Sequence, residues 1–181
     1  HHDPLLRLGH YCGQASVVCG SCLDSLIERM KPFTKEEAYN WAATRCAQKE
    51  YCRMELMQKF MQRGLSRPDC EEVLEKLERE GFVDEARYAR AFVHDKTLYN
   101  HWGRMKTRQA LAIKNIANEH IEQALATIDE EEYQQILRKL LLTKVPSIKA
   151  ATDYECAQKL LRFAAGRGFE ADLVFRVMGE D

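Results

Sequence analysis

The sequence lacks a long apolar run, an excess of charge of either sign and the alternation typical of β-strands. No apolar stretch approaches the roughly 20 residues that a membrane-spanning helix needs, so we expect no membrane partner. The chain has 27 basic and 28 acidic residues and a formal net charge of −1 at pH 7, so its overall charge does not point to nucleic acid. Runs of alternating apolar and polar residues are missing, which favours an all-α protein.

Groups typical of an active site are also scarce. No carboxylate pair, phosphate-binding glycine loop or Ser–His–Asp set stands out, so we predict no enzyme activity and no cofactor. The segment C-G-S-C at residues 19–22 resembles the element with the catalytic cysteine of papain-like proteases, but Leu23 replaces its aromatic residue. The general base should lie about 130–150 residues further on. Because the last histidine is His120, the thiol has no base and the protease interpretation fails.

The chain has seven cysteines, an odd number, and its N-terminus has no secretory pattern. We therefore expect reduced thiols and a cytoplasmic protein. A redox role for the C-G-S-C segment lacks the βαβ context that such motifs need. A zinc site made of two pairs of ligands is chemically possible, but the interval between the two pairs is shorter than usual in zinc-binding motifs. We therefore predict a protein without a metal ion. The ligands of that alternative would be His10, Cys12, Cys19 and Cys22.

From residue 34 onward nearly every segment is typical of a helix. Three pairs fit the capping-box spacing: Thr34 with Glu37, Asp129 with Glu132, and Thr152 with Glu155. Ser66 is a further expected N-cap. The apolar periodicity predicts nine helices, at approximately 35–48, 52–63, 67–80, 85–97, 103–114, 118–128, 130–143, 153–166 and 170–178.

Three of the expected helix ends resemble one another: KFMQRGLS at 59–66, ALAIKNIA at 110–117 and RFAAGRGF at 162–169. In each, a basic residue precedes Gly or Asn, and a large apolar residue follows. Gly or Asn can take the left-handed conformation that ends a helix, and the apolar residue then folds back onto it. The basic residue faces the carbonyls at the negative end of the helix, so it needs no ligand to explain it.

These helix ends recur at intervals of about 50 residues, which indicates a repeat. We therefore predict an all-α fold in which three three-helix units form a tandem array, elongated and curved. The units are expected at residues 34–83, 84–128 and 129–181. A unit of about 50 residues buries too little surface to be stable alone, so neighbours should share cores. Residues 1–33 are expected to be an N-terminal extension, tag-derived or from a mis-called start, with Met30 as the native start.

The first unit and the start of the second carry a further pattern. A basic helix ends in K-[apolar]-x-x-[basic]-G, and an apolar helix follows it. The motif after that helix consists of Gly81, Phe82, Val83, Asp84, Tyr88, Ala89 and Phe92. With the downstream GRMKTRQALAIKNIANEHIEQAL and KLLRFAAGRGFEADLV, the chain resembles the RecX family of recombinase regulators over roughly residues 34–178. Asn115 stands where that family commonly has Gly.

The resemblance implies a non-enzymatic inhibitor of RecA, and hence a role in DNA repair, DNA recombination and the SOS response. Such proteins bind the RecA–DNA filament along its groove and suppress its ATPase, strand-exchange and co-protease activities. They also bind single- and double-stranded DNA weakly. The implied partner is therefore the RecA filament, with this protein as a monomer. The alternative is a helical-repeat protein that acts on nucleic acid alone.

Basic residues gather in stretches without acids. In the first two units the middle helix is basic and the last helix is acidic, which predicts a basic stripe along the array. The predicted contact residues are Lys59, Arg63, Arg67, Lys96, Arg104, Lys106, Arg108, Lys114, Arg138, Lys139, Lys144, Lys149, Arg162 and Arg167. The alternative is that these faces are solvated and paired within and between helices. Trp102 and Tyr99 are able to stack on bases, but we expect Trp102 to fill the core of its own unit instead.

Overall fold

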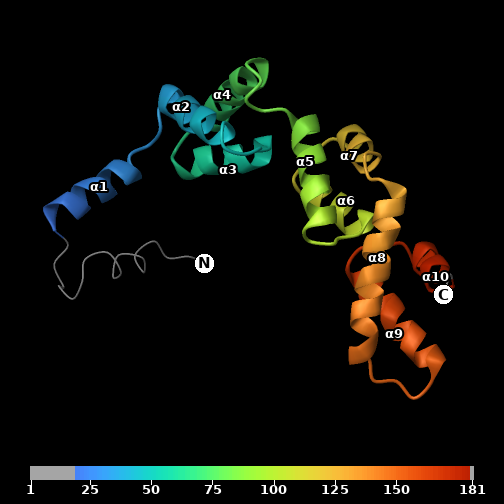
Figure 1. Cartoon of the computed structure of the whole chain (residues 1–181). Helices are drawn as coiled ribbons and strands as arrows, with labels where there is room; N and C mark the ends of the chain where they lie inside the picture. Colours follow the sequence, from blue (N-terminus) through green and yellow to red (C-terminus); the bar gives the residue numbers. More distant parts are fainter. Residues whose placement is uncertain (1–18, 180–181) are drawn as a thin grey trace.

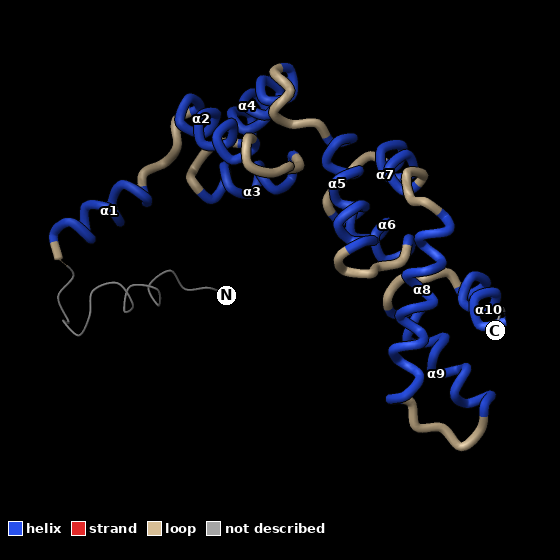
Figure 2. Tube along the Cα trace, in the orientation of Figure 1, coloured by secondary structure: helices blue, strands red, loops and turns tan. Residues whose placement is uncertain are grey.

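The computed structural model describes residues 19–179, and every regular element in that range is a helix (Figure 2). The helices are α1 (Gly20–Met30), α2 (Lys35–Cys46), α3 (Arg53–Gln62), α4 (Arg67–Arg79), α5 (Glu85–Leu98), α6 (Arg104–Ile113), α7 (Asn118–Leu125), α8 (Glu130–Lys144), the 3-10 turn η2 (Val145–Ser147), α9 (Asp153–Gly166) and α10 (Ala171–Gly179). α2 to α10 correspond one to one to the expected helices, which confirms that prediction. α1 lies in the segment for which no helix was expected.

Side-chain caps begin three of the helices as predicted. Thr34, Ser66 and Thr152 each accept a hydrogen bond from the backbone N–H three residues further on. The predicted cap at Asp129 is wrong, because its side chain accepts no hydrogen bond from the start of α8. Three glutamates, at 130–132, occupy the first turn of α8 and place negative charge at its positive end without a cap.

The repeated helix ends have the predicted left-handed residue. The φ angle is +85° at Gly64, +58° at Asn115 and +94° at Gly168. The next amide in each case donates to the carbonyl five residues earlier: Leu65 to Phe60 (3.0 Å), Ile116 to Leu111 (3.2 Å) and Phe169 to Ala164 (3.0 Å). This is the Schellman arrangement, and it returns a large apolar side chain to the core of its unit.

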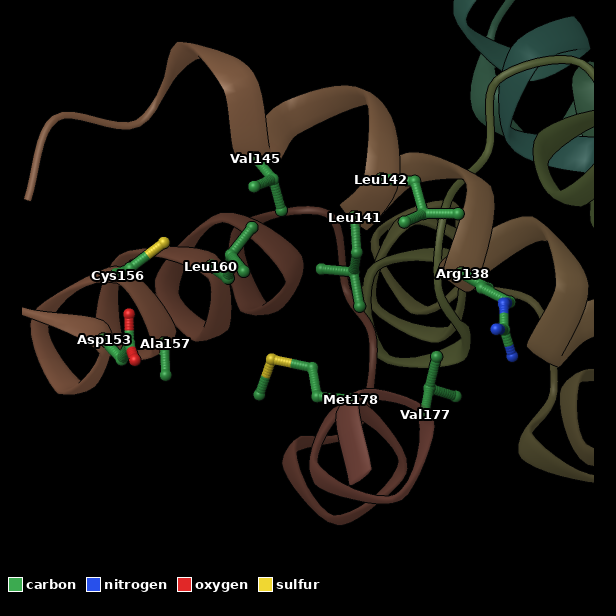
Figure 3. Close-up of a pocket in the computed structure, with 10 residues that line it drawn as sticks. All are labelled: Arg138, Leu141, Leu142, Val145, Asp153, Cys156, Ala157, Leu160, Val177 and Met178. Atoms are coloured by element: carbon green, nitrogen blue, oxygen red, sulfur yellow. The ribbon is translucent and has the colours of Figure 1, made fainter. Parts of the chain in front are cut away.

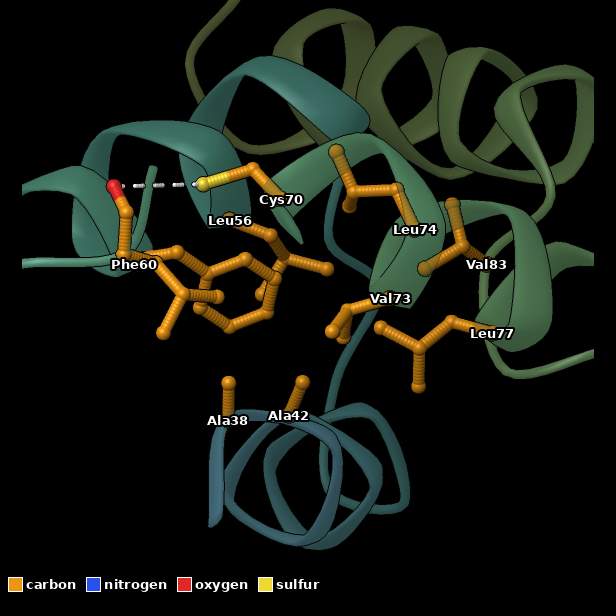
Figure 4. Close-up of a cluster of buried hydrophobic side chains, with 10 residues drawn as sticks. Ala38, Ala42, Leu56, Phe60, Cys70, Val73, Leu74, Leu77 and Val83 are labelled. Carbon is orange, nitrogen blue, oxygen red and sulfur yellow. Dashed lines mark hydrogen bonds between the residues drawn. The ribbon is translucent and has the colours of Figure 1, made fainter. Parts of the chain in front are cut away.

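The helices pack in three groups, each around its own core. α2 and α3 contact α4 in the first unit, α5 and α6 contact α7 in the second, and α8 and α9 contact α10 in the third. Figure 4 shows the first core, where the small side chains Ala38 and Ala42 of α2 let that helix lie close to Val73 and Leu77 of α4. Sharing between neighbouring cores is limited: Cys52 belongs to the second core, and Ile128 packs against the second and the third.

The three units follow one another along an arc, which confirms the predicted elongated and curved array (Figure 1). α1 lies beyond α2 at one end of the arc and buries none of its residues, and the third unit forms the other end. None of the helices in residues 19–179 has the length and apolar character needed to cross a bilayer.

Candidate functional site

The second and third units are joined through backbone atoms. The N–H of Gly103 donates to the carbonyl of Arg167 (2.7 Å), and that of Met105 donates to the carbonyl of Gly168 (3.0 Å). A Cβ on Gly103 would lie 2.2 Å from the carbonyl carbon of Gly168, so only glycine fits here. The start of α6 therefore lies directly against the turn that ends α9.

Arg104, one of the predicted contact residues, belongs to this junction. Its guanidinium pairs with Glu170 (2.9 Å) and with Glu130, and lies 4.0 Å from the centre of the Tyr133 ring. The Tyr133 hydroxyl accepts from the N–H of Arg104 (3.0 Å) and donates to Glu170 (2.7 Å). Burial raises the pKa of Tyr133, and the hydrogen bond from Arg104 lowers the pKa of Glu130. The charge of Arg104 is thus used to hold two units together.

The first and second units meet through side chains around Glu55. Three groups donate to its Oε1 atom: Tyr88 Oη (2.5 Å), Cys52 Sγ (3.3 Å) and Lys114 Nζ (3.4 Å). Burial raises the pKa of Cys52 to about 11 and also raises the pKa of Tyr88. No backbone hydrogen bond joins these two units in the part of the chain that the structure describes. This junction therefore rests on side chains, unlike the one between the second and third units.

Alkaline pH is expected to destabilise the junction around Glu55. Because burial raises the pKa of the Cys52 thiol, the unfolded chain, with a thiol pKa near 9.0, loses its proton first. The contribution of Cys52 is therefore complete below pH 9 and is lost as the pH rises to about 11. From this thiol, the free energy of unfolding by urea should fall by about 2 kcal/mol over that window, and Tyr88 should extend the fall to higher pH.

The control for this pH dependence is removal of the titrating groups. Cys52→Ala should decrease the fall in unfolding free energy between about pH 9 and 11, and adding Tyr88→Phe should decrease the fall above that window. The measurement is urea unfolding followed by circular dichroism over a series of pH values. A double variant whose stability falls as steeply as that of the wild type contradicts the prediction.

Three more of the predicted contact residues are engaged inside the chain. Arg108 donates to Glu122 (2.8 Å), and this hydrogen bond lowers the pKa of Glu122. Lys114 pairs with Glu55, as described above. Arg63 donates to the carbonyl of Lys31 (3.2 Å), and its guanidinium lies 4.0 Å from the centre of the Phe33 ring. For Arg104, Arg108 and Lys114, the geometry favours the alternative of paired charges, whereas Arg63 contacts a backbone carbonyl and an aromatic ring.

Apart from Arg138, the other predicted residues have no carboxylate partner within residues 19–179. Several face aromatic rings: Lys59 faces Trp41 (5.5 Å), Lys96 and Lys106 face Trp102 (4.6 and 4.4 Å), and Lys144 and Arg167 face Phe163 (5.1 and 5.9 Å). Four are exposed and form no ion pair within residues 19–179: Arg67, Lys139, Lys149 and Arg162. The structure thus brings Lys96 and Lys106 together on one ring and spreads the remaining charges over the array.

Arg138 lies at an open apolar pocket of about 300 Å³ between α8, α9 and α10 (Figure 3). Leu141, Leu160 and Val177 line it and also belong to the third core. Among the described residues of the lining, the charged side chains are Arg138 and Asp153. The pocket is the open edge of the third core, and most of its described lining is apolar.

The predicted zinc alternative falls partly outside the described residues, because His10 and Cys12 do. The Sγ atoms of Cys19 and Cys22 lie 3.1 Å apart. Among residues 19–179, no group of three or more histidine, cysteine, aspartate or glutamate side chains is placed to hold a metal ion.

The fold and these surfaces define an all-helical repeat protein whose charged and aromatic side chains form extended contact surfaces. Comparison with known families gives the class more closely. The family description "RecX, second three-helix domain" matches residues 84–125, and "RecX, third three-helix domain" matches residues 130–178. The chain belongs to the RecX family, which confirms the resemblance noted in the sequence.

Individual relatives agree with this assignment. The chain is 31% identical over 132 residues to the protein named Regulatory protein RecX of Pseudomonas putida (strain GB-1), covering 73% of this chain and 83% of the relative. It is 27% identical over 154 residues to the one of Amycolatopsis mediterranei (strain U-32), covering 85% of each. The crystal structure of RecX from Lactobacillus salivarius has a TM-score of 0.73 at 17% identity, over 81% of this chain and 95% of that one. That likeness shows the shared helical array.

Proposed function

We propose that this protein regulates RecA by binding the RecA–DNA filament and inhibiting its ATPase, strand-exchange and co-protease activities. One observation carries the proposal: this three-unit helical array belongs to a family whose relatives are named regulatory proteins. In this proposal the protein acts as a cytoplasmic monomer, through binding and not through catalysis.

The shape and the charges support this mode of action. An arc of repeat units presents a long continuous surface, as helical-repeat proteins commonly use to bind extended partners (Figure 1). Four exposed cations have no carboxylate partner within residues 19–179: Arg67, Lys139, Lys149 and Arg162. Their charges are therefore available to phosphates or to the acidic groups of a protein groove. We therefore propose that the contacts to the filament are made by those predicted residues whose charges are not paired inside the chain.

The test is the single-strand-dependent ATPase activity of RecA with this protein titrated in. We expect this protein to inhibit the ATPase activity at substoichiometric concentrations relative to RecA. The double reversal Lys139→Glu with Lys149→Glu should weaken the inhibition about 10-fold or more, because each reversal removes an attraction and adds a repulsion. The matched control is Arg79→Glu with Arg90→Glu, which changes two exposed arginines outside the predicted set by the same charge.

Unchanged RecA activity at saturating protein would contradict the proposal. If the same preparation binds oligonucleotides tightly, the alternative of a protein that acts on nucleic acid alone is supported. The pairing of two lysines with Trp102 favours that alternative as a second candidate, since lysines beside aromatic rings are typical of single-strand binding surfaces.

A further inference from the structure

A cluster of rings and lysines lies where α5 ends and α6 begins; we call Lys96, Tyr99, Trp102 and Lys106 the Trp102 cluster. The ammonium groups of Lys96 and Lys106 lie 4.6 and 4.4 Å from the centre of the Trp102 ring. Phe92 meets this ring edge to face, with 6.5 Å between the ring centres. The two lysines are thus held close to one another, although ten residues separate them in the chain.

Trp102 supports these lysines and does not fill the core. The ring is half-buried and is not among the residues that pack against the second core, so the prediction of a core-filling role is wrong. Phe92 occupies the place next to the core, and Trp102 packs outside it. Neither Lys96 nor Lys106 has a carboxylate partner in the described residues, so their charge is held in place by the ring and is not neutralised.

Tyr99 adds an exposed ring to the cluster. Its surface is 74% exposed, and its ring contacts that of His94 edge to face at 6.2 Å. The loop that carries it is closed by backbone hydrogen bonds from Tyr99 to the carbonyl of Asp95 (2.9 Å) and from Trp102 to the carbonyl of Lys96 (2.9 Å). A flat aromatic face is therefore presented to solvent from a backbone that is already ordered.

A groove of about 500 Å³ lies between α5 with the loop after it and the first unit, and both Lys49 and Asn100 line it. Lys96, Tyr99 and Phe92 also line it. Two of its carboxylates pair with cations, Glu50 with Arg87 and Glu55 with Lys114. The third, Asp95, contacts only the ring of its neighbour His94 (3.5 Å), which carries a charge only when protonated. Lys49 and Lys96 have no carboxylate partner within residues 19–179, so these two charges outweigh that of Asp95 and the groove keeps a net positive charge.

We propose that the Trp102 cluster binds single-stranded nucleic acid, with a base stacked on Tyr99 and the adjoining phosphates on Lys96 and Lys106. The strand then continues along the groove towards Lys49. Single strands expose the faces of their bases to aromatic side chains, whereas a duplex keeps them stacked inside. The lysines would also attract an acidic peptide, but its carboxylates would not stack on the exposed ring of Tyr99. This proposal rests on the proposed function: it identifies the residues through which a RecA regulator would contact the single strand.

The experiment uses the full chain without RecA, and a fluorescently labelled oligothymidylate of about 15 nucleotides as the probe. Fluorescence anisotropy measures its dissociation constant over a range of salt concentrations. Tyr99→Ala should weaken binding about 5- to 100-fold, the loss expected for one stacked base. The matched control is Tyr154→Ala, which removes a tyrosine of the third unit that is 75% exposed and should leave binding unchanged.

The lysines are tested by their salt dependence. The double variant Lys96→Gln with Lys106→Gln should reduce the log–log salt slope by about 1.4, the value for two phosphate contacts on a single strand. All variants should retain the helical circular dichroism of the wild type, since the changed side chains lie outside the three cores.

Three outcomes overturn this proposal. The first is a Tyr99→Ala variant that binds the oligonucleotide as tightly as Tyr154→Ala does. The second is an unchanged salt slope in the lysine variant. The third is a poly-glutamate peptide that binds as tightly as the oligonucleotide and with the same sensitivity to Tyr99→Ala, which would assign the cluster to an acidic protein.

The RecA ATPase assay separates this proposal from the proposed function. If RecA is inhibited while the wild-type chain does not bind the oligonucleotide, the cluster proposal is wrong and the proposed function stands. If the oligonucleotide binds as described while RecA is unaffected, the proposed function is wrong and the cluster proposal stands.

Discussion

Gly103→Ala is expected to lower the free energy of unfolding by about 3–5 kcal/mol, from overpacking and from the loss of two backbone hydrogen bonds. The backbone angles of Gly103 (φ −78°, ψ 167°) suit any residue, so the effect is purely steric. The added methyl group would lie 2.2 Å from the carbonyl group of Gly168 and 2.3 Å from the nitrogen of Phe169. These are backbone atoms, so no side chain can move aside and the two units must separate.

Urea unfolding measures this loss, and amide hydrogen exchange at Gly103 and Met105 locates it. The control is Gly166→Ala, which adds the same methyl group where no heavy atom of a neighbouring segment lies within 4 Å. Because Gly166 is helical, that change should be neutral or stabilise by up to about 1 kcal/mol. The interpretation of the junction fails if Gly103→Ala is as stable as Gly166→Ala.

Arg104→Ala is expected to cost about 2–3 kcal/mol of unfolding free energy, although Arg104 is one of the predicted ligand contacts. The side chain is only 21% exposed, and its removal leaves Glu130 and Glu170 without their common cation. It also uncovers the Tyr133 ring, on which the guanidinium stacks. The expected loss of unfolding free energy is smaller than for a fully buried ion pair, because Glu130 is partly solvated.

Arg108→Ala is the matched control, since this arginine lies one turn further along α6. Its side chain is 42% exposed and pairs with Glu122, so its loss should cost less than about 1 kcal/mol. Thermal or urea unfolding of the two variants gives the comparison. Equal losses for the two arginines would mean that Arg104 is an ordinary surface residue, and it would then return to the set of candidate contacts.

The helices and their ends were predictable because each depends on residues close together in the chain. The hydrogen bonds that end α3, α6 and α9 span only a few residues, and Gly64, Asn115 and Gly168 supply the left-handed conformation locally. The failed cap at Asp129 shows the limit even at short range. The side chains of Thr152 and Asp129 are both able to cap a helix, and only that of Thr152 does so in the structure.

The candidate site was less predictable, because the availability of a charge depends on distant residues. Arg104 pairs with Glu130 and Glu170, which lie 26 and 66 residues away in the chain. Lys114 reaches Glu55, at a separation of 59 residues. No contact between units was predicted for Glu55, Tyr133 or Glu170, since nothing near them in the chain indicates that two units meet there.

By itself, the sequence determined the all-α class, the positions of the helices, the three-unit repeat and the resemblance to the RecX family. Helical periodicity and helix termination act over a single turn, so the order of residues is enough to specify them. Only the tertiary structure decided which cations remain for a partner: it placed Arg104 in a junction and left Lys96 and Lys106 beside Trp102. The reason is that ion pairing depends on separation in space, which is set by the packing of whole units.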